Sequence, residues 1–521
     1  MAGDKINLSF KDTFRLFNKR LILTCVLLGV SPFNYGFDNQ GFSSIQSMDA
    51  FDKQFGEWDP KKKTYYLPTW WLSIFNAVPF VAFFFGILTG SMISKRFGRR
   101  MCVFAMSCWA LMSASVIISS RNRDQMLAGR ILNFFYVGME LSVIPVYQSE
   151  ITPRAVRGFS VGAYHTALVI GGLVVNCIGS GTQHLEGNKQ WLIPFGLFFT
   201  VPTVVVSTIW FLPESPRWLI LHDRLEQARK NLHSLRVGAF SEEEIEEEWQ
   251  QMVRGIHAEQ AQEKGSYLDL FRGFNRRRTL TIIGINIFLQ GTGQQFTSTY
   301  GAIFVKELGT INQFYYQILT LCLNIGIGFC TMYLQDRIGR RVLLFTGGTM
   351  QTVALMAMGG IGTMMPQTYS SKSAVVAMMM IYGCGYSIGW AAVSQTLNAE
   401  LCSTHMRDHS FRTASMTAII LQIAVTYALP YLLNAPYANL KSKVGFIFGA
   451  VSFIGIFYTY FCVPDCRGRS LEEIDRLFYN KVPAWKFHKV KMDELQPMED
   501  EIGEIDDMKS KSGVIVHEEK A

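Results

Sequence analysis

Charged side chains are scarce in this chain. Only 17% of its 521 residues are Asp, Glu, Lys or Arg, while 49% are hydrophobic and 39 are phenylalanine. A typical soluble protein carries about 25% charged residues. The formal net charge of +8 does not indicate a nucleic-acid partner, because the basic residues occur in short clusters between apolar runs. The composition therefore predicts a chain embedded in a lipid bilayer.

Motifs for the chemistry of soluble enzymes are missing as well. The sequence has no Walker loop, no dinucleotide-binding fingerprint and no nucleophile elbow, and its Asp, His and Ser residues show no hydrolase spacing. We therefore expect no enzyme activity and no catalytic residues. The ten cysteines include no CxxC pair and no metal-ligand spacing, so we expect packed thiols, no metal ion and no cofactor.

A signal-peptide cleavage site is absent too. Five basic residues precede the apolar run that begins at Leu21, and no small-x-small sequence follows that run. This pattern predicts a first membrane-spanning helix that is retained, not a removed signal peptide.

Long apolar stretches are what the sequence does contain. A helix needs about 20 apolar residues to cross the hydrocarbon core of a membrane. We therefore predict an all-α membrane protein with twelve transmembrane helices in two pseudo-symmetric six-helix lobes. The stretches lie near 21–45, 70–94, 102–120, 125–148, 158–181 and 190–212, and near 278–303, 314–334, 342–365, 374–400, 411–433 and 444–463.

The polar segments indicate the orientation of the chain. Most Lys and Arg clusters fall on one side of the expected spans, which the positive-inside rule assigns to the cytosol, although Lys61–Lys63 falls on the other side. The sequence Ser241–Trp249 predicts the capped start of a helix within the central polar segment. We expect the end of the tail to be disordered. The expected divisions are a cytosolic N-terminus over 1–20, a first lobe over 21–213, a cytosolic helical linker over 214–276, a second lobe over 277–464 and a cytosolic tail over 465–521.

Short motifs repeat in the two halves. LPESPRWL at Leu212–Leu219 and VPDCRGRSLEEID at Val463–Asp475 follow apolar stretches, with Pro213 and Pro464 lying 251 positions apart. The expected loops between the second and third helices of each half read SKRFGRR and QDRIGRR. Each half also has a Glu followed seven residues later by an Arg. We predict an ion-pair latch that closes one face as the lobes rock, the alternative being simple positive-inside anchors. The residues concerned are Arg99, Arg100, Glu150 and Arg157 in the first half, and Asp336, Arg340, Arg341, Glu400 and Arg407 in the second.

These motifs resemble the sugar porters of the major facilitator superfamily, especially their fungal members. The resemblance covers roughly 21–478 and rests on PESPRWL, both GRR loops and RGRSLEEID. It implies twelve helices, a central sugar site and alternating access, commonly driven by a proton gradient. We expect a monomer in the plasma membrane whose partners are a sugar, protons and the bilayer.

The resemblance also implies a proton-coupling pair. It assigns the coupling carboxylate to Asp38 in the first helix and its partner to Arg130 in the fourth. A carboxylate at membrane depth is costly unless it is paired or protonated, so a pair that forms and separates could load and release a proton. A static structural pair is the alternative. The family's further carboxylate in the sixth helix is absent, since Phe198 lies near that point, and this favours coupling through a single acid.

The seventh helix is too polar to face lipid. Its amides offer both donors and acceptors, which suits vicinal hydroxyl groups, although hydrogen bonding between helices is the alternative. The resemblance adds residues in other helices, among which His165 and Trp390 have packing roles as alternatives. The candidate substrate-binding residues are His165, Gln290, Gln294, Gln295, Tyr300, Asn324, Trp390, Gln395 and Asn434.

Three functions remain open from the sequence. The first is proton-coupled transport of a mono- or small oligosaccharide. The second is transport of another polar metabolite, such as an aromatic acid or a pathway product, because bulky residues at 133–136 crowd the fourth helix and Gln395 replaces a family tryptophan. The third is a non-transporting sugar sensor on the same scaffold.

Overall fold

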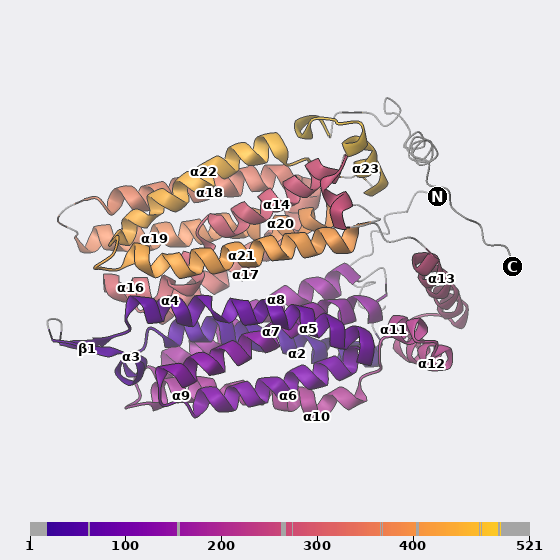
Figure 1. Ribbon diagram of the computed structural model, residues 1–521, viewed down its shortest axis with the longest axis horizontal. Helices are drawn as coiled ribbons and strands as arrows, with labels where there is room; N and C mark the ends of the chain where they lie inside the picture. The colour runs from indigo at the N-terminus through magenta and orange to yellow at the C-terminus, as the bar shows by residue number, and fades with distance from the viewer. Residues whose placement is uncertain are drawn as a thin grey trace.

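The computed structural model consists of two helical lobes that lie side by side (Figure 1). It describes residues 18–60, 63–153, 157–261, 267–273, 275–364, 366, 368–402, 406–467, 469, 471–487 and 490. Most of the tail, including the end that we expect to be disordered, lies outside these residues. Within them, eleven segments are long and apolar enough to cross a membrane, and the protein is a multi-pass membrane protein.

The N-terminal lobe contains the first six membrane-length segments. Several of these are divided by short breaks, notably where Pro79 begins a new helix. The helices are α2 (Lys19–Ile45), α4 (Thr69–Ala77) with α5 (Pro79–Phe97), α6 (Arg99–Ile118), α7 (Arg123–Ile151), α8 (Arg157–Thr182), and α9 (Lys189–Gly196) continued by η2 (Leu197–Phe199), α10 (Thr200–Thr208) and η3 (Ile209–Phe211).

The C-terminal lobe repeats this plan with one difference. Its first helix, expected to be continuous over 278–303, is broken at Thr292 and Gly293. Gly293 has a φ of 97°, a left-handed conformation that glycine adopts without strain. The helices are α14 (Asn275–Gly291), α15 (Gln294–Thr299) and α16 (Gly301–Leu308), then α17 (Gln313–Arg337), α18 (Arg340–Ile361), α19 (Tyr369–Tyr386) with η5 (Ser387–Ala391) and α20 (Ala392–Glu400), α21 (Arg407–Leu433) and α22 (Val444–Cys462).

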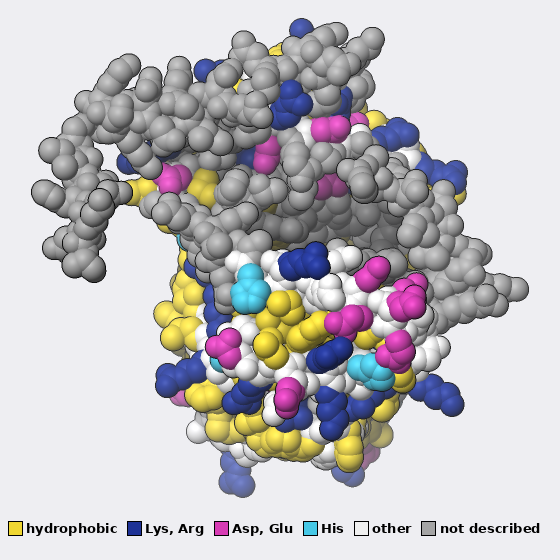
Figure 2. Space-filling model, turned by 90° about the vertical axis from the view of Figure 1, so that its right-hand side faces the viewer, with side chains coloured by type: hydrophobic (Ala, Val, Ile, Leu, Met, Phe, Trp, Pro, Cys, Tyr) yellow, Lys and Arg dark blue, Asp and Glu magenta, His cyan; other side chains and the backbone are white. Residues whose placement is uncertain are grey.

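Short elements mark the two ends of the bundle (Figure 1). We call one end the hairpin end, because it holds α3 (Asp49–Phe55) and the antiparallel strands β1 (Glu57–Asp59) and β2 (Thr64–Tyr66), with η6 (Lys441–Lys443) nearby. We call the other the linker end. It holds α11 (Pro216–Leu221), α12 (Leu225–Arg236), α13 (Glu242–Ala261), η4 (Tyr267–Phe271), α23 (Leu471–Tyr479) and η7 (Ala484–Lys486). Charged side chains are numerous on the linker end (Figure 2).

The predicted start of the linker helix is confirmed. Glu244 N–H donates to Ser241 Oγ at 3.3 Å, and Ser241 N–H donates to Glu244 Oε2 at 2.9 Å. This reciprocal capping box satisfies two backbone donors at the first turn of α13.

Close helix packing positions the first helix of the N-terminal lobe. A methyl group at Gly36 of α2 would collide with the carbonyl oxygen of Leu168 in α8, and one at Gly171 of α8 would collide with the carbonyl oxygen of Phe33. Small residues at such crossings let two membrane helices approach each other. The contact fixes the height and rotation of α2, and therefore the position of Asp38.

Candidate functional site

Asp38 and Arg130 form a buried ion pair between α2 and α7. Arg130 Nη1 lies 3.5 Å from Asp38 Oδ2, and each side chain is 2% exposed. The guanidinium also lies over the rings of Phe42 and Phe134, at 3.6 and 4.6 Å from their centroids. Asp38 Oδ1 and Arg130 Nε have no hydrogen-bond partner among the described residues. The pair is therefore long, single and incompletely satisfied, which leaves its two charges poorly compensated for their burial.

The break in the seventh span brings its polar side chains together. Gln295 Nε2 donates to Gln294 Oε1 at 2.7 Å, and Thr299 Oγ1 donates to Gln295 Oε1 at 2.9 Å. Tyr300 Oη donates to the carbonyl oxygen of Thr426 in α21 at 2.9 Å. Gln290 Oε1 is buried, and we find no partner for it in the part of the chain that the structure describes. Gln290 thus presents an unused acceptor near the middle of the C-terminal lobe.

Two further candidates lie close to this segment. Asn324 of α17 accepts a hydrogen bond from Ser387 Oγ of η5 at 2.9 Å. Trp390 of η5 is 1% exposed, and its ring centroid lies 6.0 Å from that of Phe288. Trp390 Nε1 has no hydrogen-bond partner among the described residues. The structure therefore gathers α14, α17 and η5 around one region of the C-terminal lobe.

The remaining candidates lie apart from that region. Asn434 lies at the hairpin end, where it lines a small cavity together with Tyr300. Gln395 is exposed on α20. His165 is also exposed, and it shares a heptad stripe of α8 with Gly172 and Gly179. Gly172 lies against Gln40 of α2, and Gly179 lies against Phe314 of α17, so this stripe runs along the boundary between the two lobes.

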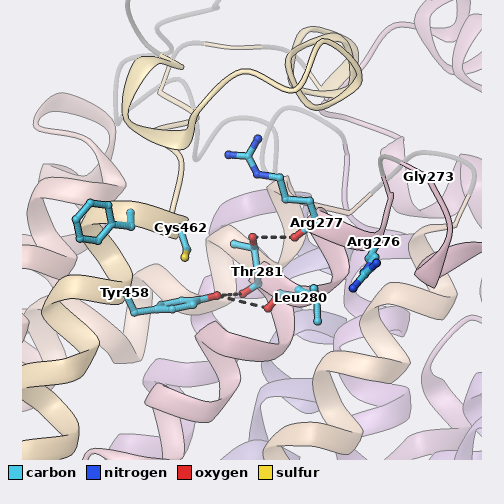
Figure 3. A pocket seen from close by; sticks show the side chains of 8 residues that line it. Gly273, Arg276, Arg277, Leu280, Thr281, Tyr458 and Cys462 are labelled. Atoms are coloured by element: carbon cyan, nitrogen blue, oxygen red, sulfur yellow. Dashed lines mark hydrogen bonds between the residues drawn. The ribbon is translucent and has the colours of Figure 1, made fainter.

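The larger cavity, of about 400 Å³, is remote from the predicted site residues. It lies between α14 and α22, and it is lined by Arg276, Arg277, Leu280, Tyr458 and neighbouring residues (Figure 3). None of the candidate residues lines it. Gln290, Asn324 and His165 line neither this cavity nor the one beside Asn434.

The repeated basic loops form two equivalent clusters at the linker end. Arg99 binds both carboxylate oxygens of Glu150, at 2.8 and 2.9 Å, and Arg340 Nη2 lies 2.8 Å from Glu400 Oε1. Each arginine also donates to a backbone carbonyl oxygen five residues earlier in the chain. The adjacent arginines also make corresponding contacts with the end of the last span of each lobe. Arg100 lies over Trp210 and donates to the carbonyl oxygen of Leu212 at 3.5 Å, and Arg341 lies over Tyr460 and donates to the carbonyl oxygen of that residue at 2.6 Å.

The glutamates therefore pair with arginines of the GRR loops, although Glu150 and Arg99 lie 51 residues apart in the chain. The side chains of Arg157, Asp336 and Arg407 lie outside the described part of the structure.

A carboxylate from the end of each lobe completes each cluster. Glu214 accepts hydrogen bonds from the backbone N–H groups of Arg99, at 2.9 Å, and Arg100, at 3.1 Å. Burial raises the pKa of the Glu214 carboxyl, while these backbone donors oppose the shift. Asp465 occupies the corresponding place beside Gly339, whose φ of 103° matches the 98° of Gly98. Negative charge at these positions stabilises the N-termini of α6 and α18.

Contacts between the lobes gather at the hairpin end. Lys306 Nζ of α16 lies 2.8 Å from Asp49 Oδ1 and 3.4 Å from Asp52 Oδ2 of α3. Ser43 Oγ of α2 donates to the carbonyl oxygen of Thr299 at 2.7 Å. These bonds join the two lobes, so the molecule is closed at this end.

Sequence reasoning did not single out Lys306, Asp52, Glu214 or Glu140. Glu140 lies in the middle of α7 with its side chain 0% exposed. An acidic residue within an apolar run was the available signal for it. Among the described residues, we find no group of three or more His, Cys, Asp or Glu side chains that could hold a metal ion.

Comparison with known proteins identifies related transporters and a sensor. The family described as "Sugar (and other) transporter" matches residues 24–478. The chain is 27% identical over 489 residues to the high glucose sensor RGT2 of Saccharomyces cerevisiae, which covers 91% of this chain but only 63% of the sensor. It is 23% identical over 476 residues to the hexose transporter HXT8 of the same yeast, covering 89% of this chain and 83% of HXT8.

A solved structure shares the fold. The inward-open conformation of the xylose transporter XylE from E. coli superimposes with a TM-score of 0.72 at 18% identity, covering 88% of this chain and 99% of XylE. This agreement over both lobes confirms the predicted arrangement of two six-helix bundles.

Proposed function

Because this chain belongs to the family of sugar (and other) transporters, we propose that it moves a sugar across the membrane by alternating access, coupled to proton binding at Asp38. The observation that carries the proposal is the buried Asp38–Arg130 pair. The relatives compared above are named as a transporter and a sensor, so we propose no enzymatic step. We further propose that the protein works as a monomer in the plasma membrane.

The polarity of the ends supports the direction of alternating access. The linker end carries the GRR loops, so the positive-inside rule assigns it to the cytosol and the hairpin end to the outside. Bonds between Lys306, Asp49 and Asp52 close the outer end in this conformation. Opening of the outer end requires these bonds to break as the two lobes rock against each other.

Proton coupling follows from the electrostatics of the pair. When Asp38 is ionised, Arg130 compensates its charge, although the single contact of 3.5 Å does so incompletely. When Asp38 takes up a proton, the attraction disappears and Arg130 is left as a buried cation that only the faces of Phe42 and Phe134 stabilise. Protonation therefore favours a rearrangement of α2 against α7, which is the movement that coupling needs.

The proposed sugar site lies around the broken seventh span. The unused acceptor of Gln290 and the amides of Gln294 and Gln295 suit hydroxyl groups, and Asn324 adds another amide nearby. Trp390 and Phe288 supply aromatic surface in the same region. We include His165 as a contact from the facing lobe.

The test is uptake of radiolabelled sugars in a host that lacks its own transporters, with and without a protonophore. We expect wild-type cells to accumulate one or more sugars above the external concentration and to lose this ability with the protonophore. Asp38→Asn should abolish accumulation but retain exchange, whereas the exposed Asp124→Asn in α7 should behave as wild type. Accumulation by Asp38→Asn would place the coupling site elsewhere.

A sensor is the second candidate, because the relative RGT2 is named a high glucose sensor. A protein that binds glucose but transports no sugar in this panel would favour it. Transport of a polar metabolite other than a sugar would favour the remaining alternative, which the family description "Sugar (and other) transporter" allows.

A further inference from the structure

Glu140 is a second carboxylate that is buried at membrane depth. It lies on α7, and its side chain is 0% exposed. Tyr164 Oη of α8 donates a hydrogen bond to Glu140 Oε2 at 2.7 Å. Glu140 Oε1 has no hydrogen-bond partner within the described part of the chain. The group therefore has one hydrogen bond where an ionised carboxylate needs several.

The helices around Glu140 supply no cation to balance it. Among their described side chains, Arg130 is the one permanent cation between the helix ends, and it contacts Asp38. The groups nearest to Glu140 are phenols: Tyr164, Tyr136 of its own helix and Tyr35 of α2. His165 follows Tyr164 on α8 and is exposed. The other basic residues of these helices lie at the helix ends: Arg123 lies at the hairpin end of α7, and the rest lie at linker ends, namely Lys19, Arg20, Lys95, Arg96, Arg99, Arg100 and Arg157.

Two carboxylates are thus buried at membrane depth, but the one arginine described there contacts Asp38 and not Glu140. An ionised carboxylate without a cation is strongly destabilised in a medium of low dielectric constant, and such a group normally takes up a proton instead. Glu140 is therefore the carboxylate that is neutral in this conformation. The protonated form of Glu140 also fits its surroundings, because the hydrogen bond from Tyr164 satisfies the carbonyl oxygen of the neutral carboxyl group.

The position of Glu140 on α7 sets the depth at which this proton is held between the hairpin end and the linker end. On α7, Arg123 contacts the hairpin end and Glu150 contacts the linker end. Glu140 lies ten residues beyond Arg130, which is about 15 Å nearer to the linker end. Tyr35 lies about one turn before Asp38 on α2, on the side of the N-terminus of this helix, which contacts α12 at the linker end.

We propose that Glu140 is a second proton-binding site, which holds a proton while the hairpin end is closed and releases it towards the linker end. In the release step the O–H bond of the Glu140 carboxyl group breaks, the proton passes to water that enters from the linker end, and the carboxylate keeps the electron pair. Tyr164 then donates its hydrogen bond to the anion. The role of Glu140 in proton release during transport rests on the proposed function, whereas the presence of a proton on Glu140 does not depend on it.

The first test needs no substrate. Infrared difference spectra of the purified full-length protein in lipid nanodiscs report the carbonyl stretch of protonated carboxylic acids. We expect the wild type at about pH 7 to show a carboxylic acid band that Glu140→Gln removes. The exposed Glu226→Gln and the paired Asp38→Asn should keep the band. Spectra of wild type and Glu140→Gln that superimpose would overturn the inference.

A second variant protects the test against misfolding. Tyr164→Phe keeps the ring but removes the hydrogen bond to Glu140, so we expect the carbonyl band to move to higher frequency. A purely structural role of Glu140 would not produce this shift in a folded protein. If Glu140→Gln does not fold and the band of Tyr164→Phe does not move, the inference is wrong.

The third test separates this inference from the proposed function. In proteoliposomes with D-glucose as the probe, Glu140→Gln should retain counterflow but lose most of its proton uptake per glucose. If the wild type transports neither glucose nor any other sugar, the proposed sugar transport is wrong. An infrared band that depends on Glu140 would still support the proton site in that case. Unchanged proton uptake in an active Glu140→Gln would overturn the release role.

Discussion

Replacing Lys306 with alanine should open the hairpin end. The Lys306 ammonium group joins the lobes there through ion pairs of 2.8 Å with Asp49 and 3.4 Å with Asp52. The Asp49 side chain is 89% exposed, so solvent screens most of its attraction, whereas Asp52 is only 20% exposed. The substitution leaves Asp52 half-buried against the other lobe without its cation. Closure then requires the burial of an unpaired carboxylate.

The magnitude follows from this exposure. A partly exposed ion pair contributes about 1 kcal/mol or less, because side-chain entropy and screening offset its Coulomb energy. A change of about 1 kcal/mol shifts the ratio of closed to open molecules roughly fivefold. The remaining bonds, including that of Ser43 to Thr299, should keep the end partly closed.

Pulsed electron spin resonance distances between the lobes can measure this shift. Spin labels at Leu185 and Tyr437, both exposed at the hairpin end of different lobes, would report it in a background without native cysteines. Lys53→Ala is the matched control, since Lys53 is an exposed cation of α3 for which we find no ion pair in the described structure. A Lys306→Ala distribution identical to wild type, or to that of Lys53→Ala, would refute the reasoning.

The closure of the hairpin end should also depend on pH, through the protonation of Asp52. Burial raises the pKa of Asp52 from 3.8 to about 6, Lys306 opposes this shift and Asp49 adds to it. Opening exposes the group and returns its pKa towards 3.8, so the closed state binds the proton more tightly. The resulting stabilisation of closure is complete below about 3.8 and is lost as the pH rises through about 6. We expect acidification to increase the closed population in wild type, and Asp52→Asn to flatten this dependence.

Three further substitutions test the sites. Gln290→Ala should weaken sugar binding about ten- to a hundredfold, since one lost hydrogen-bond partner costs roughly 1–3 kcal/mol, as calorimetry can measure. Glu214→Gln removes one of two acceptor oxygens from the N-terminus of α6, and it should lower the melting temperature while Glu226→Gln does not. His165→Gln should leave hexose transport intact; its loss at normal protein levels would favour the transporter of another polar metabolite.

Most of the fold could be predicted because membrane thickness dictates helix length. Apolar runs of about 20 residues located the twelve spans to within a few residues, except in the seventh. There the sequence FLQGTGQQF did not reveal that the helix is broken, because membrane helices often contain glycine without a break. Only the left-handed conformation of Gly293 and the packing of Tyr300 against α21 distinguish a break from a continuous helix.

The charged residues at the linker end could be predicted from the repeat, but their individual contacts could not. The repeat identified Glu150 and Glu400 as carboxylates near two-arginine turns, but it does not reveal which arginine of each turn reaches the carboxylate in space. Arg99 reaches Glu150 because α6 and α7 pack against each other over their length. Glu140 was missed for another reason: it lies within an apolar run of α7, outside the motifs on which the resemblance rests.

The carboxylates that follow each lobe explain why the repeat extends beyond the membrane spans. Glu214 and Asp465 lie just after the last spans of their lobes, and each lies beside a glycine of positive φ that precedes a GRR loop. Each cluster therefore ties the third helix of a lobe to the fourth through an arginine, and to the end of the sixth through a carboxylate. Three helix ends joined in this way move together. Because the two clusters share these contacts, we expect the linker end of each lobe to move as a rigid unit. Rocking would then take place at the surfaces between the lobes, where α2 and α8 face α15, α16 and α17, and where α4 and α5 face α21.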